Sequence, residues 1–358
     1  MVDSMPDAER RPLTDLVENA LTARFEKTPL ETVEALVHAH FGLQGNACVL
    51  NSERDETFRL TAADGQNFIV KLASPLERQE ILTFQTEALL HLASKDLSVP
   101  LPRPVATRNG DYIAEVQPAD ERRMLRVLTY LDGTLLFRIE PSIRQMRSIG
   151  NALGALNRAL SDFKPVVPRQ SLLWDLCTAA ELRQYLPSVA QERRVLVAGI
   201  LDALAALEQG ALKHVRRQII HNDFNPHNIL VDDAEPSRVT GVIDFGDMVE
   251  APLVNDIAVA LSYQVAAGED LSLMLAMLGA FQAVQPLEPD EIDCLPALIR
   301  GRLAMTITIT EWRAALYPEN RAYILRNHPL AERGLKKLSA VTDAELADLF
   351  RTTLGDRR

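Results

Sequence analysis

One polar stretch, residues 217–245, constrains the fold and chemistry of this chain more than any other. Short apolar runs at residues 219–220 and 229–231 flank a segment that carries His221, Asp223 and Asn228 in H-x-D-x-x-x-x-N spacing. Short apolar runs bounded by polar turns are typical of buried strands. The pattern therefore predicts a polar loop held between two short strands.

A second acidic residue follows this loop at a defined point. A polar turn leads to another apolar run that ends at Val242-Ile243, directly before Asp244-Phe245-Gly246. Phosphoryl transfer needs one carboxylate to orient and deprotonate the attacking hydroxyl, and an amide oxygen and a second carboxylate to hold Mg²⁺ on the nucleotide phosphates. The alternative is a surface loop that merely contains acids. The paired spacing, the apolar runs and the D-F-G together favour phosphoryl transfer.

Length, charge and cysteine content narrow the class of protein. The chain has 358 residues, enough for two lobes with separate cores. The net charge of −11 gives no electrostatic argument for binding nucleic acid or an anionic membrane, but it suits a cationic small substrate. Cys48, Cys177 and Cys294 are widely spaced and odd in number. They exclude a disulfide framework and a C-x-x-C metal site, and they indicate free thiols in a reducing compartment.

Targeting signals are not evident in the sequence. The first residues carry acids and lack the apolar core of a signal peptide. No stretch approaches 18 uninterrupted apolar residues, so we expect no membrane span. We therefore expect a cytoplasmic protein. The sequence does not define an oligomeric state.

The first third of the chain is typical of a small lobe built on an antiparallel sheet. Helical spacing of apolar residues appears over residues 13–25 and 30–41, as an N-terminal extension. The Asp64-Gly65 pair is a strong hairpin signal. Five strands and one main helix are expected, at residues 47–51, 56–62, 67–73, 112–116 and 124–130, with the helix at 76–94. We predict that residues 1–130 form this N-terminal lobe.

Lys71 is the candidate for contact with the nucleotide phosphates. It stands in the middle of the third strand, flanked by apolar residues, where a kinase-like site places such a lysine. A lysine on a solvated strand face is the alternative. A glutamate on the following helix should pair with it, and both Glu80 and Glu87 are available; we favour Glu87 because it lies deeper in the helix.

Two further segments are candidates for nucleotide binding. The turn at residues 51–55 lacks a glycine-rich loop, but Ser52 and its neighbours can offer hydroxyl and backbone N–H groups to phosphates. The strand end at residues 128–133 is predicted to be a hinge. Backbone groups of Thr129 and Leu131 can face the edge of a purine there, although an ordinary strand end would look the same.

Residues 131–358 are predicted to form a larger, mostly helical C-terminal lobe. Apolar spacing predicts helices at residues 143–160, 193–207, 271–281, 295–315 and 343–354. Two further helices are predicted to begin at residues 173 and 255. Asp256 either caps the helix that begins near it or holds the 221–228 loop through its backbone amides. A cleft between the two lobes is the default binding site.

These motifs resemble those of the aminoglycoside phosphotransferase and choline kinase superfamily. The resemblance rests on Lys71, on residues 221–228 and on Ile243 to Asp247, and it extends over nearly the whole chain from about residue 30. SERDETF at 52–58, LTYLDGTLL at 128–136, LLWDL at 172–176 and GVIDFGDM at 241–248 are similar to the hydroxylysine kinase branch. The resemblance implies an α+β, bilobal protein-kinase-like fold. It also implies phosphorylation of 5-hydroxylysine with Mg²⁺ and a nucleoside triphosphate, either ATP or GTP.

Roles follow from the resemblance by position. Asp223 would be the base, Asn228 and Asp244 the Mg²⁺ ligands, Lys71 the phosphate clamp, Glu87 its partner, and His221 a brace for the loop. One departure is Asn222, which stands where relatives often have glycine, and Phe224 follows Asp223.

A hydroxylated amino acid needs a carboxylate near its ammonium group and an arginine near its carboxylate. Asp247, Asp175 and Trp174 are candidates for the cationic end, with Trp174 acting through a cation–π contact. Arg302 and Arg313 are candidates for the anionic end. The alternatives are a homoserine, amino-alcohol or aminoglycoside kinase, or a catalytically silent nucleotide-binding protein of the same fold. Because lysine, base, amide and metal acid are all present, the sequence favours an enzyme.

Overall fold

The computed structural model describes residues 27–50, 52, 55–118, 121–168, 170 and 172–355. The helix predicted over residues 13–25 lies outside this part of the chain. The chain divides into two compact units. Among described residues, the first unit takes the chain up to Thr86, Arg103–Tyr130 and Pro168–Leu173, and the second takes Glu87–Pro102, Leu131–Val167 and Trp174 onward. One division thus falls at the predicted boundary after residue 130, while residues 87–102 belong to the second unit and 168–173 to the first.

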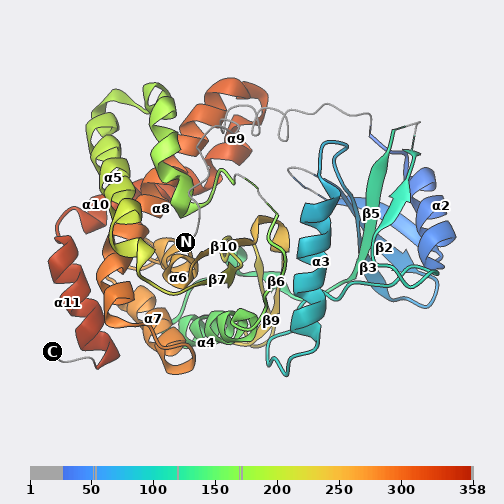
Figure 1. Ribbon diagram of the computed structural model, residues 1–358, viewed down its shortest axis with the longest axis horizontal. Helices are drawn as coiled ribbons and strands as arrows, with labels where there is room; N and C mark the ends of the chain where they lie inside the picture. The colour runs from blue at the N-terminus through green and yellow to red at the C-terminus, as the bar shows by residue number, and fades with distance from the viewer. Residues whose placement is uncertain are drawn as a thin grey trace, which may run out of the picture. The chain divides into compact units, whose positions relative to one another are not determined.

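The first unit contains the predicted five-stranded antiparallel sheet, in the order β1-β2-β3-β5-β4 (Figure 1). Its strands are β1 Gly45–Leu50, β2 Glu56–Ala62, β3 Asn67–Leu72, β4 Ala114–Val116 and β5 Arg123–Thr129. The β2–β3 turn is the predicted one: Gly65 has φ 87°, a conformation that favours glycine, and its N–H donates to the Ala62 carbonyl at 2.9 Å. Side chains alternate along β3, which points Phe68, Val70 and Leu72 into the core.

Helices cover the two faces of this sheet. Helix α2, Leu30–Phe41, packs Val33, Val37 and Phe41 against the apolar face. Helix α3, Gln79–Ala93, begins in the first unit, where Leu82 packs with Ala73 and Met124 on the other face. Lys71 alternates with the buried residues of β3, so it leaves the sheet on the α3 side.

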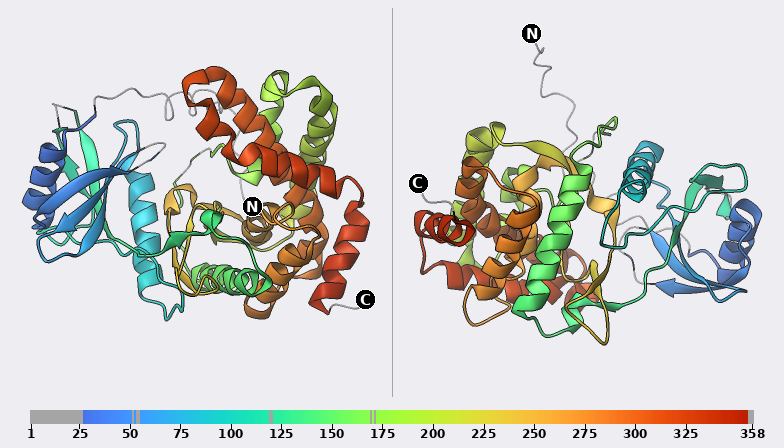
Figure 2. Two further views of the ribbon diagram at one scale, coloured as in Figure 1. Left: turned by 180° about the vertical axis from the view of Figure 1, so that it is seen from behind. Right: turned by 90° about the horizontal axis from the view of Figure 1, so that it is seen from below.

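The second unit is mainly helical, as the sequence predicted. Helices α4 (Ile143–Leu160) and α7 (Ser272–Val284) lie side by side in all views (Figures 1 and 2). Their close approach requires Gly150, because a Cβ there would lie 2.2 Å from the Met277 carbonyl oxygen. The long helix α8, Pro289–Leu316, packs against a set of neighbours: η4 (Leu176–Ser188), α5 (Gln191–Gln209), α6 (Leu253–Ser262), α10 (His328–Leu338) and α11 (Asp343–Leu354).

Two small antiparallel sheets hold the motif stretch within the second unit. Strand β7, Arg217–Ile220, pairs with β10, Val249–Pro252. Strand β8, Ile229–Val231, lies between β6, Thr134–Leu135, and β9, Val239–Val242. The 221–228 loop therefore leaves one sheet and enters another, as predicted. Burial of both strands fixes the two ends of the loop.

One helical stretch bears on the expected absence of a membrane span. Among the described residues, Gln191–Lys213 is long and apolar enough to cross a bilayer by length and composition, with a mean hydropathy of 1.6 in its most apolar window. Core helices pass the same test. This stretch includes α5, which buries Val197, Leu201 and Leu204 and packs against η4 and α8, but only 22% of its most apolar window is buried. The expectation of no membrane partner stays a prediction.

Candidate active site

The carboxylate of Asp223 is held by three side chains of the second unit. Asn225 donates to Oδ1 at 2.8 Å, and Asn228 donates to Oδ2 at 2.7 Å. Arg302 Nη2 lies 3.3 Å from Oδ1. The side chain keeps 22% of its surface exposed, so the carboxylate is oriented but still reachable. This is the geometry that a base acting on a bound hydroxyl requires.

The environment of Asp223 also tunes its basicity. Burial, followed by the negative charge of Asp247, raises the pKa of Asp223 to about 7, and Arg302 opposes the rise. Asp244 adds a smaller effect in the same direction. A base with a pKa near neutrality suits proton transfer at physiological pH. Because the negative charges of Asp247 and Asp244 both act on Asp223, the surroundings of these three carboxylates are favourable for a cation.

Asp244 and Asn228 fit the role of magnesium ligands. Asp244 is exposed and has φ 63°, and its Oδ1 accepts from the Gly246 N–H at 3.4 Å, at the start of the short helix η6, Phe245–Asp247. The Asn228 amide nitrogen is used by Asp223, which leaves its oxygen for a metal. Mg²⁺ is usually held by one or two protein groups together with substrate phosphates. Among the described residues, no group of three or more His, Cys, Asp or Glu side chains is placed to hold a metal ion.

His221 braces the loop from inside. It has no exposed surface, and its ring packs at the edges of Phe224 and Phe245. Its Nδ1 accepts from the Asp223 N–H at 3.3 Å, while Nε2 lies 3.1 Å from the Ile243 carbonyl oxygen. Nε2 therefore carries the proton. The ring ties the loop to the strand that delivers Asp244.

The sequence left two roles open for Asp256, and in the structure its carboxylate holds the 221–228 loop. It is the fourth residue of α6 and is fully buried. Its carboxylate accepts from the backbone N–H of His221 at 3.2 Å and of Asn222 at 2.8 Å, and from the Asn157 side chain at 2.8 Å. Asn222 has φ 64°, a left-handed conformation that asparagine tolerates. Burial raises the pKa of Asp256, and the adjacent His221 and these hydrogen bonds oppose the rise.

We expect Asp256→Ala to destabilise the protein by about 3 kcal/mol or more, since three buried donors lose their acceptor at roughly 1–3 kcal/mol each. Asp256→Asn should cost less, because one amide oxygen still accepts. Chemical denaturation measures both changes. Asp348→Ala, at a carboxylate with 75% exposure, is the control and should change stability by less than about 0.5 kcal/mol. An Asp256→Ala protein as stable as the wild type would show that the loop does not depend on this carboxylate.

The structure brings two of the predicted substrate residues, Arg302 and Trp174, into contact with each other. Arg302 is 1% exposed, donates to the Trp174 carbonyl oxygen and lies 4.9 Å from the centre of the Trp174 ring. Asp175 is buried and accepts from the Cys177 N–H at 2.9 Å, which caps η4. Arg313 is also buried. These contacts give Arg302 a role in positioning Asp223. Among the predicted substrate residues, Asp247 has the largest electrostatic effect on the pKa of Asp223.

The predicted nucleotide residues are spread over elements of the first unit and the start of the second. Lys71 is directly opposite Arg126 on β5. Thr129 ends β5, and its hydroxyl accepts from the Arg103 N–H at 2.9 Å. Ser52 is exposed, and Leu131 is half-buried in the second unit. Each role stays a prediction.

The α3 position that faces the sheet is occupied by a residue that the sequence did not single out. Glu80 and Glu87 are both exposed. Gln85 is buried, and its Oε1 accepts from the Arg126 guanidinium at 3.0 Å. Arg126 lies within an apolar strand, and a charged residue at such a position is a signal of a buried polar contact that the sequence analysis did not use. Which glutamate pairs with Lys71 stays a prediction.

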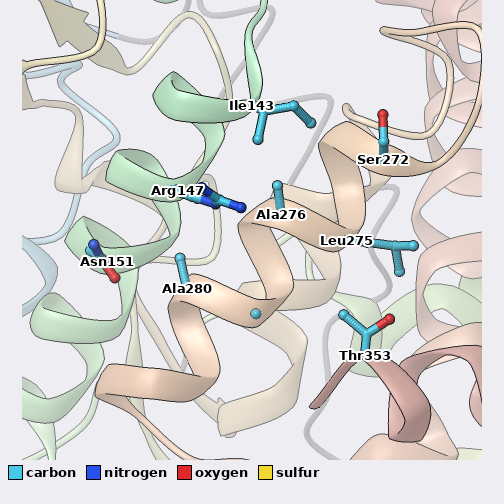
Figure 3. A pocket seen from close by; sticks show the side chains of 9 residues that line it. Ile143, Arg147, Asn151, Ser272, Leu275, Ala276, Ala280 and Thr353 are labelled. Carbon is cyan, nitrogen blue, oxygen red and sulfur yellow. The ribbon is translucent and has the colours of Figure 1, made fainter. Parts of the chain in front are cut away.

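A hollow lies on the helical surface of the second unit. It is a groove of about 590 Å³ between α4, α7 and the end of α11 (Figure 3). Arg147 and Asn151 line it from α4, with Ala276 and Ala280 opposite and Thr353 at one end. It contains none of the residues predicted for the site.

Comparisons with known proteins find kinases among the relatives of this chain. Hydroxylysine kinase from Mus musculus is 26% identical over 336 residues, covering 86% of this chain and 88% of the relative. Homoserine kinase from Parvibaculum lavamentivorans is 27% identical over 321 residues, covering 86% and 89%. Among solved structures, an amicoumacin kinase in complex with AMP-PNP, Ca²⁺ and Ami has a TM-score of 0.65 at 16% identity, covering 87% of this chain and 95% of that chain. The fold is therefore the predicted α+β kinase-like fold.

The model of one protein family matches residues 47–295, which is more than half of the chain and includes both the sheet with Lys71 and the 221–228 loop. The match, together with the kinase relatives, confirms the predicted enzyme class, a phosphotransferase that acts on a hydroxyl group. The chain belongs to the phosphotransferase enzyme family.

Proposed function

We propose that this small-molecule kinase transfers the γ-phosphate of ATP or GTP, with Mg²⁺, to the hydroxyl group of a hydroxylated amino acid, 5-hydroxy-L-lysine in the first place. The observation that carries the proposal is the site around Asp223, where an oriented carboxylate is accompanied by Asp247 and Asp244 and backed by Arg302. The hydroxylysine kinases among the relatives support the choice of acceptor.

In this mechanism the acceptor hydroxyl lies against Asp223, which takes its proton as the oxygen attacks the γ-phosphorus. Asn225 and Asn228 hold the carboxylate in place for that transfer. Asp244 and the oxygen of Asn228 would hold Mg²⁺, which neutralises charge on the phosphates. We assign to Lys71 the contact with the nucleotide phosphates, and to Asp247 the contact with the ammonium group of the acceptor.

A homoserine kinase is the second candidate, because homoserine kinases also match over most of the chain. Both acceptors carry a hydroxyl, an ammonium and a carboxylate, so the same acids would serve either one. Amino-alcohol and aminoglycoside kinases share the fold at 19% identity or less. The cytoplasmic location that we infer from the composition belongs to the same proposal.

The test is nucleotide turnover with each acceptor, run separately with ATP and with GTP. We expect kcat/KM for 5-hydroxy-L-lysine to exceed that for ethanolamine, choline or kanamycin by about tenfold or more, because an unpaired charged group in the site costs more than about 1.4 kcal/mol. L-homoserine is the comparison within the amino acids. Chelation of Mg²⁺ should abolish turnover with either nucleotide. A preference for choline or an aminoglycoside would refute the choice of substrate class.

A further inference from the structure

His227 connects the 221–228 loop to a part of the chain that lies 100 residues later. Its Nε2 lies 3.2 Å from Oδ1 of Asn327, in the short helix η8, Leu325–Asn327. On its other side the ring packs against Phe137, with 4.4 Å between ring centres. His227 immediately precedes Asn228, which holds Asp223. Helix η8 is therefore attached to the segment that positions the base.

Arg326, next to Asn327, presents a guanidinium at this place. The side chain is exposed, and its Cζ lies 3.9 Å from the centre of the Tyr323 ring. Nη1 donates to the Tyr323 carbonyl oxygen at 3.2 Å. Stacking and this hydrogen bond restrict the guanidinium to one region, so little of its freedom remains to be lost when it binds a ligand.

The charge of Arg326 acts on groups that surround the base. It lowers the pKa of His227, although burial is the larger cause. It also opposes the rise in the pKa of Tyr263 that burial produces. Tyr263 in turn contacts Arg302, which lies 3.3 Å from Asp223. Arg326 and Asp223 therefore both lie within electrostatic range of Tyr263.

Arg302 and Arg326 differ in how far they are exposed. Arg302 is 1% exposed and is committed to Asp223 and the Trp174 carbonyl oxygen. Arg326 is exposed, and its charge acts on Tyr263. Asp247 and Asp244 supply negative charge around the base, which suits an ammonium group but repels an acceptor's carboxylate. An anionic group on the acceptor therefore needs a cation outside this acidic cluster.

We propose that Arg326 binds the carboxylate of the acceptor and so makes the enzyme selective for hydroxylated amino acids over simple amino alcohols. This inference rests on the proposed function. It replaces Arg302 and Arg313, the residues that the sequence suggested for this role, because both are buried.

The experiment compares two acceptors that differ only in the carboxylate: 5-hydroxy-L-lysine and its decarboxylated analogue, 1,5-diaminopentan-2-ol. In Arg326→Gln, kcat/KM for 5-hydroxy-L-lysine should fall by about 10–100-fold, mainly through KM, as expected for the loss of a charged hydrogen bond. Turnover of the analogue and KM for the nucleotide should stay within about twofold. Arg326→Lys, which keeps the charge without the planar fork, should be intermediate. Arg321→Gln, at an exposed arginine in the same segment, is the matched control and should behave like the wild type.

The outcomes separate the two proposals. If the wild type turns over 5-hydroxy-L-lysine well and Arg326→Gln keeps the preference over the analogue, Arg326 is not the carboxylate-binding residue while the proposed function stands. An equal loss for both acceptors would also refute the role in selectivity. If the wild type prefers the analogue or another acceptor without an anionic group, the proposed function and the role of Arg326 both fail.

Discussion

Asp223→Asn should lower turnover by about 10²–10⁴, the range for loss of a general base. The amide has nearly the same shape as the carboxylate, but it cannot accept the proton of the attacking hydroxyl. It also places an NH₂ group among side chains that already donate, Asn225, Asn228 and Arg302. The lost rate therefore combines a missing base with poorer orientation of the acceptor. Steady-state kinetics with 5-hydroxy-L-lysine measures it.

Nucleotide affinity separates this effect from general damage to the protein. Calorimetric titration with nucleotide and Mg²⁺ should give a similar Kd for Asp223→Asn and the wild type, because Asp223 is assigned to the acceptor. Asp233→Asn is the matched control, at an exposed acid in the β8–β9 turn of the same stretch, and it should keep normal turnover. Near-normal turnover by Asp223→Asn would remove Asp223 from the mechanism.

Local sequence patterns predicted those parts of the fold that depend on neighbours along the chain. Helices α4 and α11 begin and end at the predicted residues, and the β2–β3 turn forms at Asp64-Gly65. Helix α10 was missed. Pro329 and Gly334 weaken its helical signal, whereas burial of Ala331, Leu335 and Leu338 stabilises it in the folded protein.

The candidate site was likewise predictable only where its residues are close together in the sequence. The spacing from His221 to Asn228 put Asp223 and Asn228 in one short loop. Because both ends of the loop are buried strands, the two side chains meet there. Contacts across long sequence separations were not predictable. Arg302 reaches Asp223 from 79 residues away, and Asn327 reaches His227 from 100 residues away. No local pattern encodes which helical arginine is buried against the base and which is exposed.

Asp244→Ala should abolish the Mg²⁺-dependent part of nucleotide binding and lower turnover by about 10²–10³, the scale for loss of a group that stabilises developing charge. The physical reason is the position of the carboxylate. It is exposed, stands at the end of the β8–β9 hairpin and raises the pKa of Asp223 by its charge. Calorimetry with nucleotide, at a series of Mg²⁺ concentrations, measures the coupling between metal and nucleotide.

The backbone at Asp244 requires a second variant. At φ 63° an alanine is strained by roughly 1–2 kcal/mol, whereas asparagine tolerates this conformation. Asp244→Asn also keeps one oxygen as a neutral ligand, so it should retain the fold and lose only part of the metal coupling. Asp247→Asn, three residues later, should raise KM for the acceptor and leave the metal coupling unchanged. If Asp244→Ala folds and its nucleotide affinity still responds to Mg²⁺ as in the wild type, Asp244 supports the turn at η6 and does not bind the metal.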